Sequence, residues 1–293
     1  MVTTPGVESL RFIIEELASW PYDPDRASLH VGDLGWNHQF GAEWLAGSLR
    51  VWVEDDRLAA VGLLDEPDLL RLAVAPRARH DEDFVRRLAD DLDAADSRVL
   101  PVGEVAVEAR FEGPLRDLLL ARGWQDDEAW TPLVRDLTDP VPEHHLRVVE
   151  VDAHHLPDRL AVHHSAFDRT TFTQQRWQAM TEGPGYRQAR SLVGYDVDDC
   201  AVAMVTVWAA GSHPGELEPM GVHRNHQGRG HGRAICLAAS TALQEMGASH
   251  AFVSTPSTNL GAIATYRAAG FEEKTQVHDL RRPADSSAAV VTG

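Results

Sequence analysis

Apolar residues recur along the chain with two alternating periods, which together predict a mixed α/β protein. In the first half, the three- and four-residue spacing from Leu10 to Leu17 predicts a helix over 6–20, and a similar pattern predicts another over 81–94. Between these helices, short apolar runs separated by an acidic turn predict a hairpin and a third strand. The predicted strands of this half are 49–53, 58–64, 69–74 and 103–109, and a last helix is predicted at 115–122.

The second half repeats this succession of strands and helices. Val74 and Val222 end corresponding apolar strands 148 residues apart, and the pairs Gly123-Trp124 and Gly270-Phe271 lie 147 residues apart. Two anchors with nearly the same offset indicate a tandem repeat. The predicted strands are 146–151, 192–195, 201–209, 215–222 and 250–255, and the predicted helices are 156–167, 173–181, 231–246 and 259–269.

The repeat and a proline-containing connection predict the domain boundaries. Residues 1–138 form the first predicted domain and residues 147–282 the second, joined by a linker at 139–146 that begins Asp-Pro-Val-Pro. Residues 283–293 are small and polar and are predicted to be a flexible tail.

A glycine-rich turn marks the most informative stretch of the second half. Gly228, Gly230 and Gly232 lie between a strand and a helix, where the absence of a Cβ lets the backbone approach a ligand. The first N–H groups of the helix have no partner within it, and the helix dipole is positive at that end. With Arg229 and Arg233 nearby, the turn predicts a site for a diphosphate.

The details of this turn carry a family resemblance. The segment Gln227-Gly228-Arg229-Gly230-His231-Gly232 resembles the acyl-CoA signature Gln/Arg-x-x-Gly-x-Gly/Ala of the GNAT superfamily of N-acetyltransferases. A second segment, Asn259-x-x-Ala-x-x-x-Tyr266-x-x-x-Gly-Phe, resembles the last helix and strand of that family. The resemblance implies two tandem GNAT-like domains, each a twisted mixed sheet flanked by helices, with acetyl-CoA as co-substrate.

The first repeat departs from this signature. It reads Arg77-Ala-Arg-His-Asp-Glu-Asp83 where the second repeat has its glycines, so side chains and three carboxylates occupy the predicted diphosphate position. Negative charge at this end of a helix also has the wrong sign for a phosphate ligand. We therefore expect the first domain to be a degenerate GNAT-like copy without an intact CoA site.

The resemblance implies a set of coenzyme-binding residues. In the family the strand that contains the equivalent of Pro219 separates from the strand at 250–255, and pantetheine lies in the gap. Backbone N–H groups of Met220 and Val222 would then bind the acetyl carbonyl and the pantetheine arm. The full expected set is Met220, Val222, Gln227, Gly228, Arg229, Gly230, His231, Gly232, Arg233, Asn259 and Tyr266.

Acid and base candidates lie beside this gap. Side chains two apart on a strand share a face, so Glu216, Glu218 and Met220 are expected to project together, and one of the two glutamates is the expected base. Glu216 lies 11 residues before Gln227, the position that the resemblance gives to a base. The resemblance makes Tyr266, four residues before Gly270, the expected general acid for the CoA sulfur.

The helix-loop-helix at 156–181 forms one wall of the acceptor site in the family. This places Asp168, Arg169 and Trp177 as substrate candidates, and the alternative for each is a cap or a packing residue.

The amino-acid composition of the chain limits the classes of partner that it can bind. A net charge of −18 opposes nucleic acid or an anionic membrane as the main partner. It is compatible with a cationic amine substrate, and equally with acidic residues that only solvate the surface. No apolar run reaches the roughly 20 residues of a membrane span, so we expect a cytoplasmic enzyme. We expect this enzyme to be a monomer or a homodimer. Cys200 and Cys236 are expected to be buried. The fifteen histidines include three adjacent pairs, whose members point different ways on a helix, so no metal is expected.

These observations predict an acetyl-CoA-dependent N-acetyltransferase that modifies a primary amine of a small molecule, such as an antibiotic or an amino sugar. No Ser or Thr with a His-Asp pairing is evident, so direct attack in a ternary complex is expected. The alternative is a sensor or scaffold that binds acyl-CoA without turnover.

Overall fold

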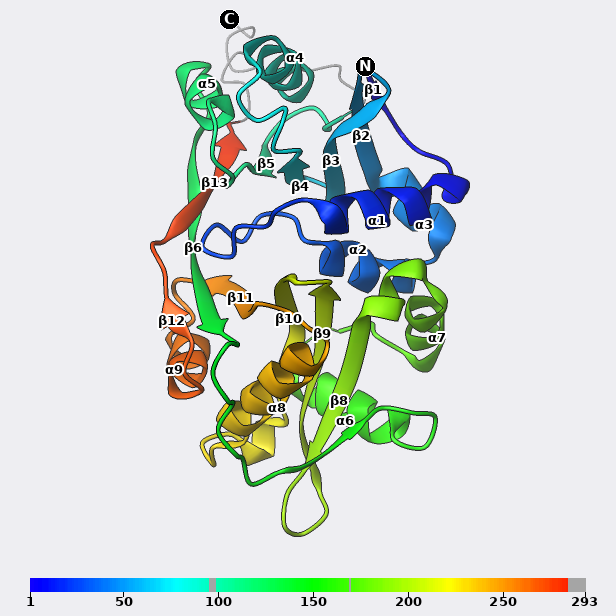
Figure 1. Cartoon of the computed structure of the whole chain (residues 1–293), viewed down its shortest axis with the longest axis vertical. Coiled ribbons are helices and arrows are strands. Elements are labelled where there is room, and N and C mark those ends of the chain that lie inside the picture. The colour runs from blue at the N-terminus through cyan, green and yellow to red at the C-terminus, as the bar shows by residue number, and fades with distance from the viewer. Residues whose placement is uncertain (95–98, 169, 284–293) are drawn as a thin grey trace, which may run out of the picture.

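The computed structural model describes residues 1–94, 99–168 and 170–283, and the predicted tail at 284–293 lies outside them. The described residues form one thirteen-stranded mixed sheet with helices on its faces (Figure 1). The strand order is β1-β2-β3-β4-β5-β13-β6-β11-β10-β9-β8-β7, with β12 (Glu272–Glu273) paired to β6. The predicted α/β fold, with its mixed sheet and flanking helices, is confirmed.

The first half contributes one end of this sheet. Helices α1, α2 and α3 pack on one face, and α4 and α5 pack on the other. The strands are β1 (Val2–Thr3), β2 (Leu49–Glu54), β3 (Arg57–Glu66), β4 (Leu69–Val74) and β5 (Val105–Glu108), and the helices are α1 (Leu10–Ser19), α2 (Val31–Asn37), α3 (Ala42–Ser48), α4 (Glu82–Asp93) and α5 (Leu115–Ala121).

The second half contributes the other end. Helices α8 and α9 cover one face, and α6 and α7 cover the other. The strands are β7 (Arg147–Glu150), β8 (Ala189–Tyr195), β9 (Ala201–Ala210), β10 (His213–Val222) and β11 (His250–Pro256), and the helices are α6 (Leu156–Ala166), α7 (Gln174–Glu182), α8 (His231–Glu245) and α9 (Leu260–Ala268).

The two halves exchange their last strands. β6 (Gln125–Asp136) ends the first half in sequence but pairs antiparallel with β11 of the second half. β13 (Val277–Arg282) ends the second half but pairs antiparallel with β5 of the first. β6 and β13 also pair with each other, and both run along the edge of the view between the halves (Figure 1). The halves therefore share a continuous hydrogen-bonded sheet. Neither strand was predicted from the sequence.

The corresponding anchors of the repeat occupy corresponding places. β4 ends at Val74 and β10 ends at Val222, and each strand pairs antiparallel with the preceding strand and parallel with the following one. Gly123 and Gly270 both have positive φ, 96° and 84°, directly after helices α5 and α9. This backbone conformation is the usual helix-ending role of glycine.

The two cysteines differ in their exposure to solvent. Cys236 is buried as expected, but Cys200 is exposed because it lies in the turn before β9, so that prediction was wrong for Cys200.

Within the described parts of the chain, no helix combines the length and the apolar character needed to cross a membrane.

Candidate active site

The two central strands of the second half separate partway along their length. β10 and β11 pair only at Gly215 with Ala251 and at Glu216 with Phe252. Beyond Glu216 the strands diverge, although β10 continues to Val222. A cavity of about 670 Å³ lies at this point, bounded by the ends of β10, α6, α8 and α9. The expected separation of these two strands is therefore present.

The start of α8 faces this cavity with its backbone donors free of a side-chain cap. The N-cap residue is Gly230, with φ +84°, and no side chain caps the helix. In the first half, α4 has Asp81 at the same place, and its carboxylate accepts the N–H of Phe84 at 2.9 Å. Glu82 and Asp83 add further negative charge in the first turn. An anion would be attracted to the start of α8 and repelled from the start of α4.

Nine of the eleven expected coenzyme residues line this cavity. Arg229 and Tyr266 do not line it. The N-cap of α9 is Asn259, whose Oδ1 accepts the N–H of Ala262 at 3.2 Å. The nine residues are Met220, Val222, Gln227, Gly228, Gly230, His231, Gly232, Arg233 and Asn259.

A bulge in β10 changes which side chains share a face. The pairing with β9 shifts between Leu217 and Met220, where three steps on β10 match two on β9. Leu217 and Met220 therefore both pack toward the core under α8, while Glu216 pairs with Trp208 on the opposite face. The prediction that Met220 projects with Glu216 was wrong, because strict alternation fails at a bulge.

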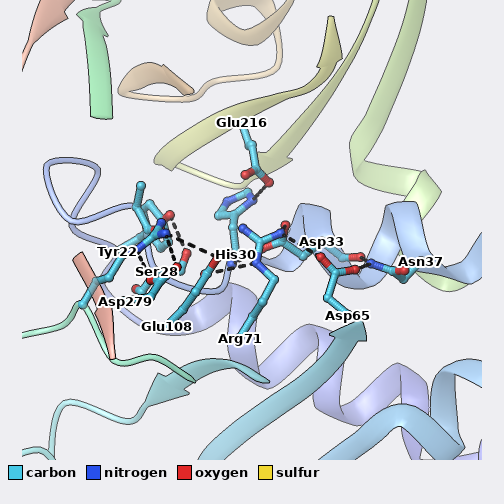
Figure 2. A network of polar contacts seen from close by, with 12 residues as sticks. Tyr22, Ser28, His30, Asp33, Asn37, Asp65, Arg71, Glu108, Glu216 and Asp279 are labelled. Atoms are coloured by element: carbon cyan, nitrogen blue, oxygen red, sulfur yellow. Dashed lines mark hydrogen bonds and ion pairs between the residues drawn. The ribbon is translucent and has the colours of Figure 1, made fainter. Parts of the chain in front are cut away.

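Glu216 is buried against the first half. Its Oε2 lies 3.2 Å from Nδ1 of His30, which precedes α2 (Figure 2). The helix approaches so closely at Gly32 that a Cβ there would lie 2.6 Å from the same oxygen. Gly32 N–H already donates to His30 Nδ1 at 3.0 Å, so this nitrogen is an acceptor. The contact is a hydrogen bond when Glu216 carries a proton.

The pKa values of the pair agree with this protonation state. Burial raises the pKa of Glu216; Arg71 opposes this effect, Glu108 and Asp65 add to it, and the resulting pKa is about 7. Burial lowers the pKa of His30 to about 4. Between about pH 4 and pH 7 the pair is therefore a neutral carboxylic acid beside a neutral imidazole.

A chain of charged groups continues from this pair across the interface between the halves. The backbone N–H of His30 donates to Asp33 at 2.7 Å, and Arg71 forms ion pairs with Asp33 and Glu108. Arg110 then connects Glu108 to Asp279 on β13 (Figure 2). Buried charges that are paired in this way hold one geometry, because breaking a pair leaves an uncompensated charge.

Glu218 lies near enough to both Glu216 and Tyr266 to interact with them electrostatically. Glu218 is partly exposed, and its carboxylate makes no hydrogen bond or ion pair with the described residues. Burial, and then the charge of Glu216, raise the pKa of Glu218 to about 7. Tyr266 is 5% exposed, and burial together with the charges of Cys236 and Glu218 keeps its pKa well above 10. At neutral pH, Glu218 can accept a proton and Tyr266 retains one.

His30 was missed by the sequence analysis. It lies 186 residues from Glu216, so no local pattern links the two. The available signal was the spacing of His30 and Asp33, because the side chain of each caps the backbone of the other at the start of α2.

Replacing His30 with alanine is expected to lower the free energy of unfolding by roughly 2–4 kcal/mol. The helix cap accounts for about 1 kcal/mol, and the unpaired buried Glu216 for about 1–3 kcal/mol. His30→Asn is expected to recover most of the loss, because an amide oxygen can replace Nδ1 as acceptor. Urea unfolding measures both. His80→Ala, at an exposed position of the same half, is the control. Equal stability of His30→Ala and the parent would contradict the assigned contact.

The substrate candidates occupy different surroundings. Asp168 is exposed and pairs with Arg224 at 3.0 Å. Trp177 is 7% exposed and packs over the guanidinium of Arg159, with 5.3 Å between Cζ and the ring centre. Neither lines the cavity at the start of α8, and Arg169 lies outside the described residues.

Comparisons with known proteins agree with this geometry. Residues 150–271 match the model of the Acetyltransferase (GNAT) family. A tandem GNAT protein from the clavulanic acid biosynthesis pathway, solved without AcCoA, is 16% identical with a TM-score of 0.57, covering 97% of this chain and 99% of its own. The sequence matches no curated protein.

Two further solved structures cover nearly the whole chain. A GNAT-family acetyltransferase from Colwellia psychrerythraea is 12% identical with a TM-score of 0.57, covering 96% of this chain and 98% of its own. A GCN5-related N-acetyltransferase from Sphaerobacter thermophilus is 18% identical with a TM-score of 0.53, covering 96% and 95%. At these identities the likeness concerns the fold alone. Residues 150–271 match the GNAT family model, and the described chain has the fold of the tandem GNAT proteins.

Proposed function

We propose that the second half transfers an acetyl group from acetyl-CoA to a primary amine of a small molecule. The observation that carries this proposal is the separation of β10 from β11 beside the free start of α8. Together they provide a slot for an extended thioester arm and an anion site at its end. The first half has the aspartate-capped helix α4 instead, so we assign coenzyme binding to the second half alone.

Direct attack within a ternary complex requires a neutral amine. Glu218, with a pKa of about 7, would take the proton from the ammonium form through a water molecule or directly. The nitrogen then attacks the thioester carbon, and the carbonyl oxygen gains negative charge that backbone N–H groups near Met220 would stabilise. As the C–S bond breaks, the CoA thiolate takes a proton from Tyr266. The amine nitrogen loses its second proton to solvent, Tyr266 regains a proton from solvent, and Glu218 releases the one it accepted.

The acceptor is expected to be cationic in solution. The chain carries 45 acidic residues against 27 basic ones, and carboxylates of both halves gather near Glu216. A negative potential of this kind concentrates a positively charged amine and disfavours phosphorylated acceptors. We propose that the amine reaches the thioester from the face of β10 that carries Glu216 and Glu218. Nucleic acid and membrane partners are not part of this proposal.

A binding protein without turnover is the second candidate. One observation favours it: neither Glu218 nor Tyr266 lines the cavity at the start of α8. An acyl-CoA sensor needs the phosphate site but not the acid and the base.

One assay separates the two candidates. Purified protein is supplied with saturating acetyl-CoA and a panel of aminoglycosides, amino sugars, amino acids and polyamines, and a thiol reagent measures CoA release. We expect release above the hydrolysis rate with at least one class of amine, with mass spectrometry showing a gain of one acetyl group. Tight acetyl-CoA binding without release from any amine would support the sensor. No binding at millimolar acetyl-CoA would overturn both.

A further inference from the structure

Three potential metal ligands converge from separate elements beside the cavity. Asp196 follows β8, His226 ends the short 3-10 helix at 224–226, and His231 is the first residue of α8. One ligand atom from each residue lies within 4.8 Å of those of the other two. The sequence analysis expected no metal because it considered only the adjacent histidine pairs. None of these three residues belongs to such a pair.

The carboxylate of Asp196 is oriented by the backbone of its own turn. Its Oδ1 accepts the N–H groups of Asp198 at 3.1 Å and Cys200 at 3.0 Å. Its Oδ2 lies 3.8 Å from Nδ1 of His226. This separation is too long for a hydrogen bond. His226 Nδ1 is nevertheless buried and has no hydrogen-bond partner among the described residues. Two ligand atoms thus face each other across a gap that neither fills.

The third ligand is oriented by a further histidine. Nδ1 of His231 lies 3.0 Å from Nε2 of His145. When His231 is the donor in this bond, its Nε2 keeps a lone pair for a ligand. Metal-binding histidines commonly donate their second ring N–H in this way, which fixes both the tautomer and the ring orientation. His145 thus holds His231 in position to coordinate an ion.

We propose that Asp196, His226 and His231 bind one divalent transition-metal ion, with zinc as the best fit. Two imidazoles and one carboxylate are a common set of three protein ligands for zinc, with a fourth position left open. Ligand atoms around a tetrahedral zinc lie about 3.4 Å apart, from bond lengths of about 2.0–2.2 Å. The 3.8 Å between Asp196 and His226 requires only a small side-chain movement to reach that value.

The ion would lie beside the proposed diphosphate site. His226 and His231 line the same cavity as Gly228 and Gly230. Two added positive charges there would strengthen the binding of a diphosphate, and the ion would tie the glycine turn to the β8–β9 turn. The stronger binding of a diphosphate rests on the proposed function, whereas the metal site itself does not.

The metal site is tested without coenzyme. Tag-free protein is stripped with a chelator and titrated with cobalt, followed by visible absorption, and with zinc in competition with a chromophoric chelator. We expect one ion per chain with at least micromolar affinity. Asp196→Asn and His226→Ala should each weaken binding at least tenfold with an unchanged circular dichroism spectrum. Cys200→Ser removes the exposed thiol of the same turn and should leave binding intact. No binding at 100 µM metal, or equal binding by His226→Ala, would overturn the site.

The coupling is tested with acetyl-CoA, whose sulfur is blocked and does not compete for zinc. Calorimetry of stripped and zinc-loaded protein should show several-fold tighter acetyl-CoA binding with zinc, and no difference in Asp196→Asn. Equal affinities in the parent would overturn the coupling. Failure of the stripped protein to bind acetyl-CoA at any concentration would instead count against the proposed function, because the cobalt titration is judged separately.

Discussion

Gly230→Asp is expected to weaken acetyl-CoA binding by roughly 100-fold. Gly230 is the N-cap of α8, and an added Cβ there would have no heavy atom closer than 3.8 Å, so the variant should fold. Its carboxylate would face the proposed diphosphate. Two like charges about 5 Å apart repel by about 3 kcal/mol at an effective dielectric constant of 20. Since about 1.4 kcal/mol corresponds to a tenfold change, calorimetry should record a Kd about two orders of magnitude higher.

Gly211→Asp is the matched control. Gly211 also has positive φ, at 61°, and has open space at its Cβ, but it lies in the turn between β9 and β10. Both variants add one negative charge and carry a similar backbone strain of about 1–2 kcal/mol. Only Gly230→Asp should lose acetyl-CoA affinity. If both variants bind acetyl-CoA as tightly as the parent, the start of α8 is not the phosphate site.

Glu218→Gln is expected to reduce turnover by roughly 10²–10⁴-fold with acetyl-CoA affinity retained, the range typical of a lost general base. In the parent, kcat/KM should rise with pH through about 7, because Glu218 must lose its proton before it can accept one from the amine. The variant should lose this dependence. Steady-state kinetics from pH 5.5 to 9, with the best amine of the panel, measure both.

Glu216→Gln separates the two glutamates. The amide imitates protonated Glu216 and can donate to His30, so the fold should be kept. Because the charge of Glu216 raises the pKa of Glu218, removing that charge should move the pH profile of kcat/KM to lower pH with a smaller loss of turnover. The reverse ranking, with Glu216→Gln the slower variant, would make Glu216 the base. Tyr266→Phe, measured alongside, should slow turnover without weakening acetyl-CoA binding.

Local patterns predicted most of the elements but missed the two that join the halves. β6 begins with Gln125, followed by the acidic residues 126–128, and contains Pro132, a sequence that does not resemble a buried central strand. Its partners lie far away in sequence, as in the pairing of Phe252 with Val134. A strand of this kind is specified by the neighbours that cover it, and no window of adjacent residues contains them.

In the candidate site, too, some features could be predicted from local sequence and others could not. The glycine turn is a contiguous segment whose conformation follows from residue type, so its place at the cavity could be predicted. The partnership of His30 with Glu216 could not, because it depends on how the two halves pack. The orientation of Met220 depends on a bulge, which shifts alternation by one residue and leaves no clear signal in the sequence.

The strand exchange makes each repeat depend on the other for a complete sheet. Each repeat completes its sheet with a strand encoded by the other, so a single repeat made alone would leave an apolar edge at β11 or β5 open to aggregation. Cutting the peptide between residues 139 and 146 would leave the fragments interlocked. The first repeat is therefore needed to complete the sheet of the second, whether or not it binds a coenzyme.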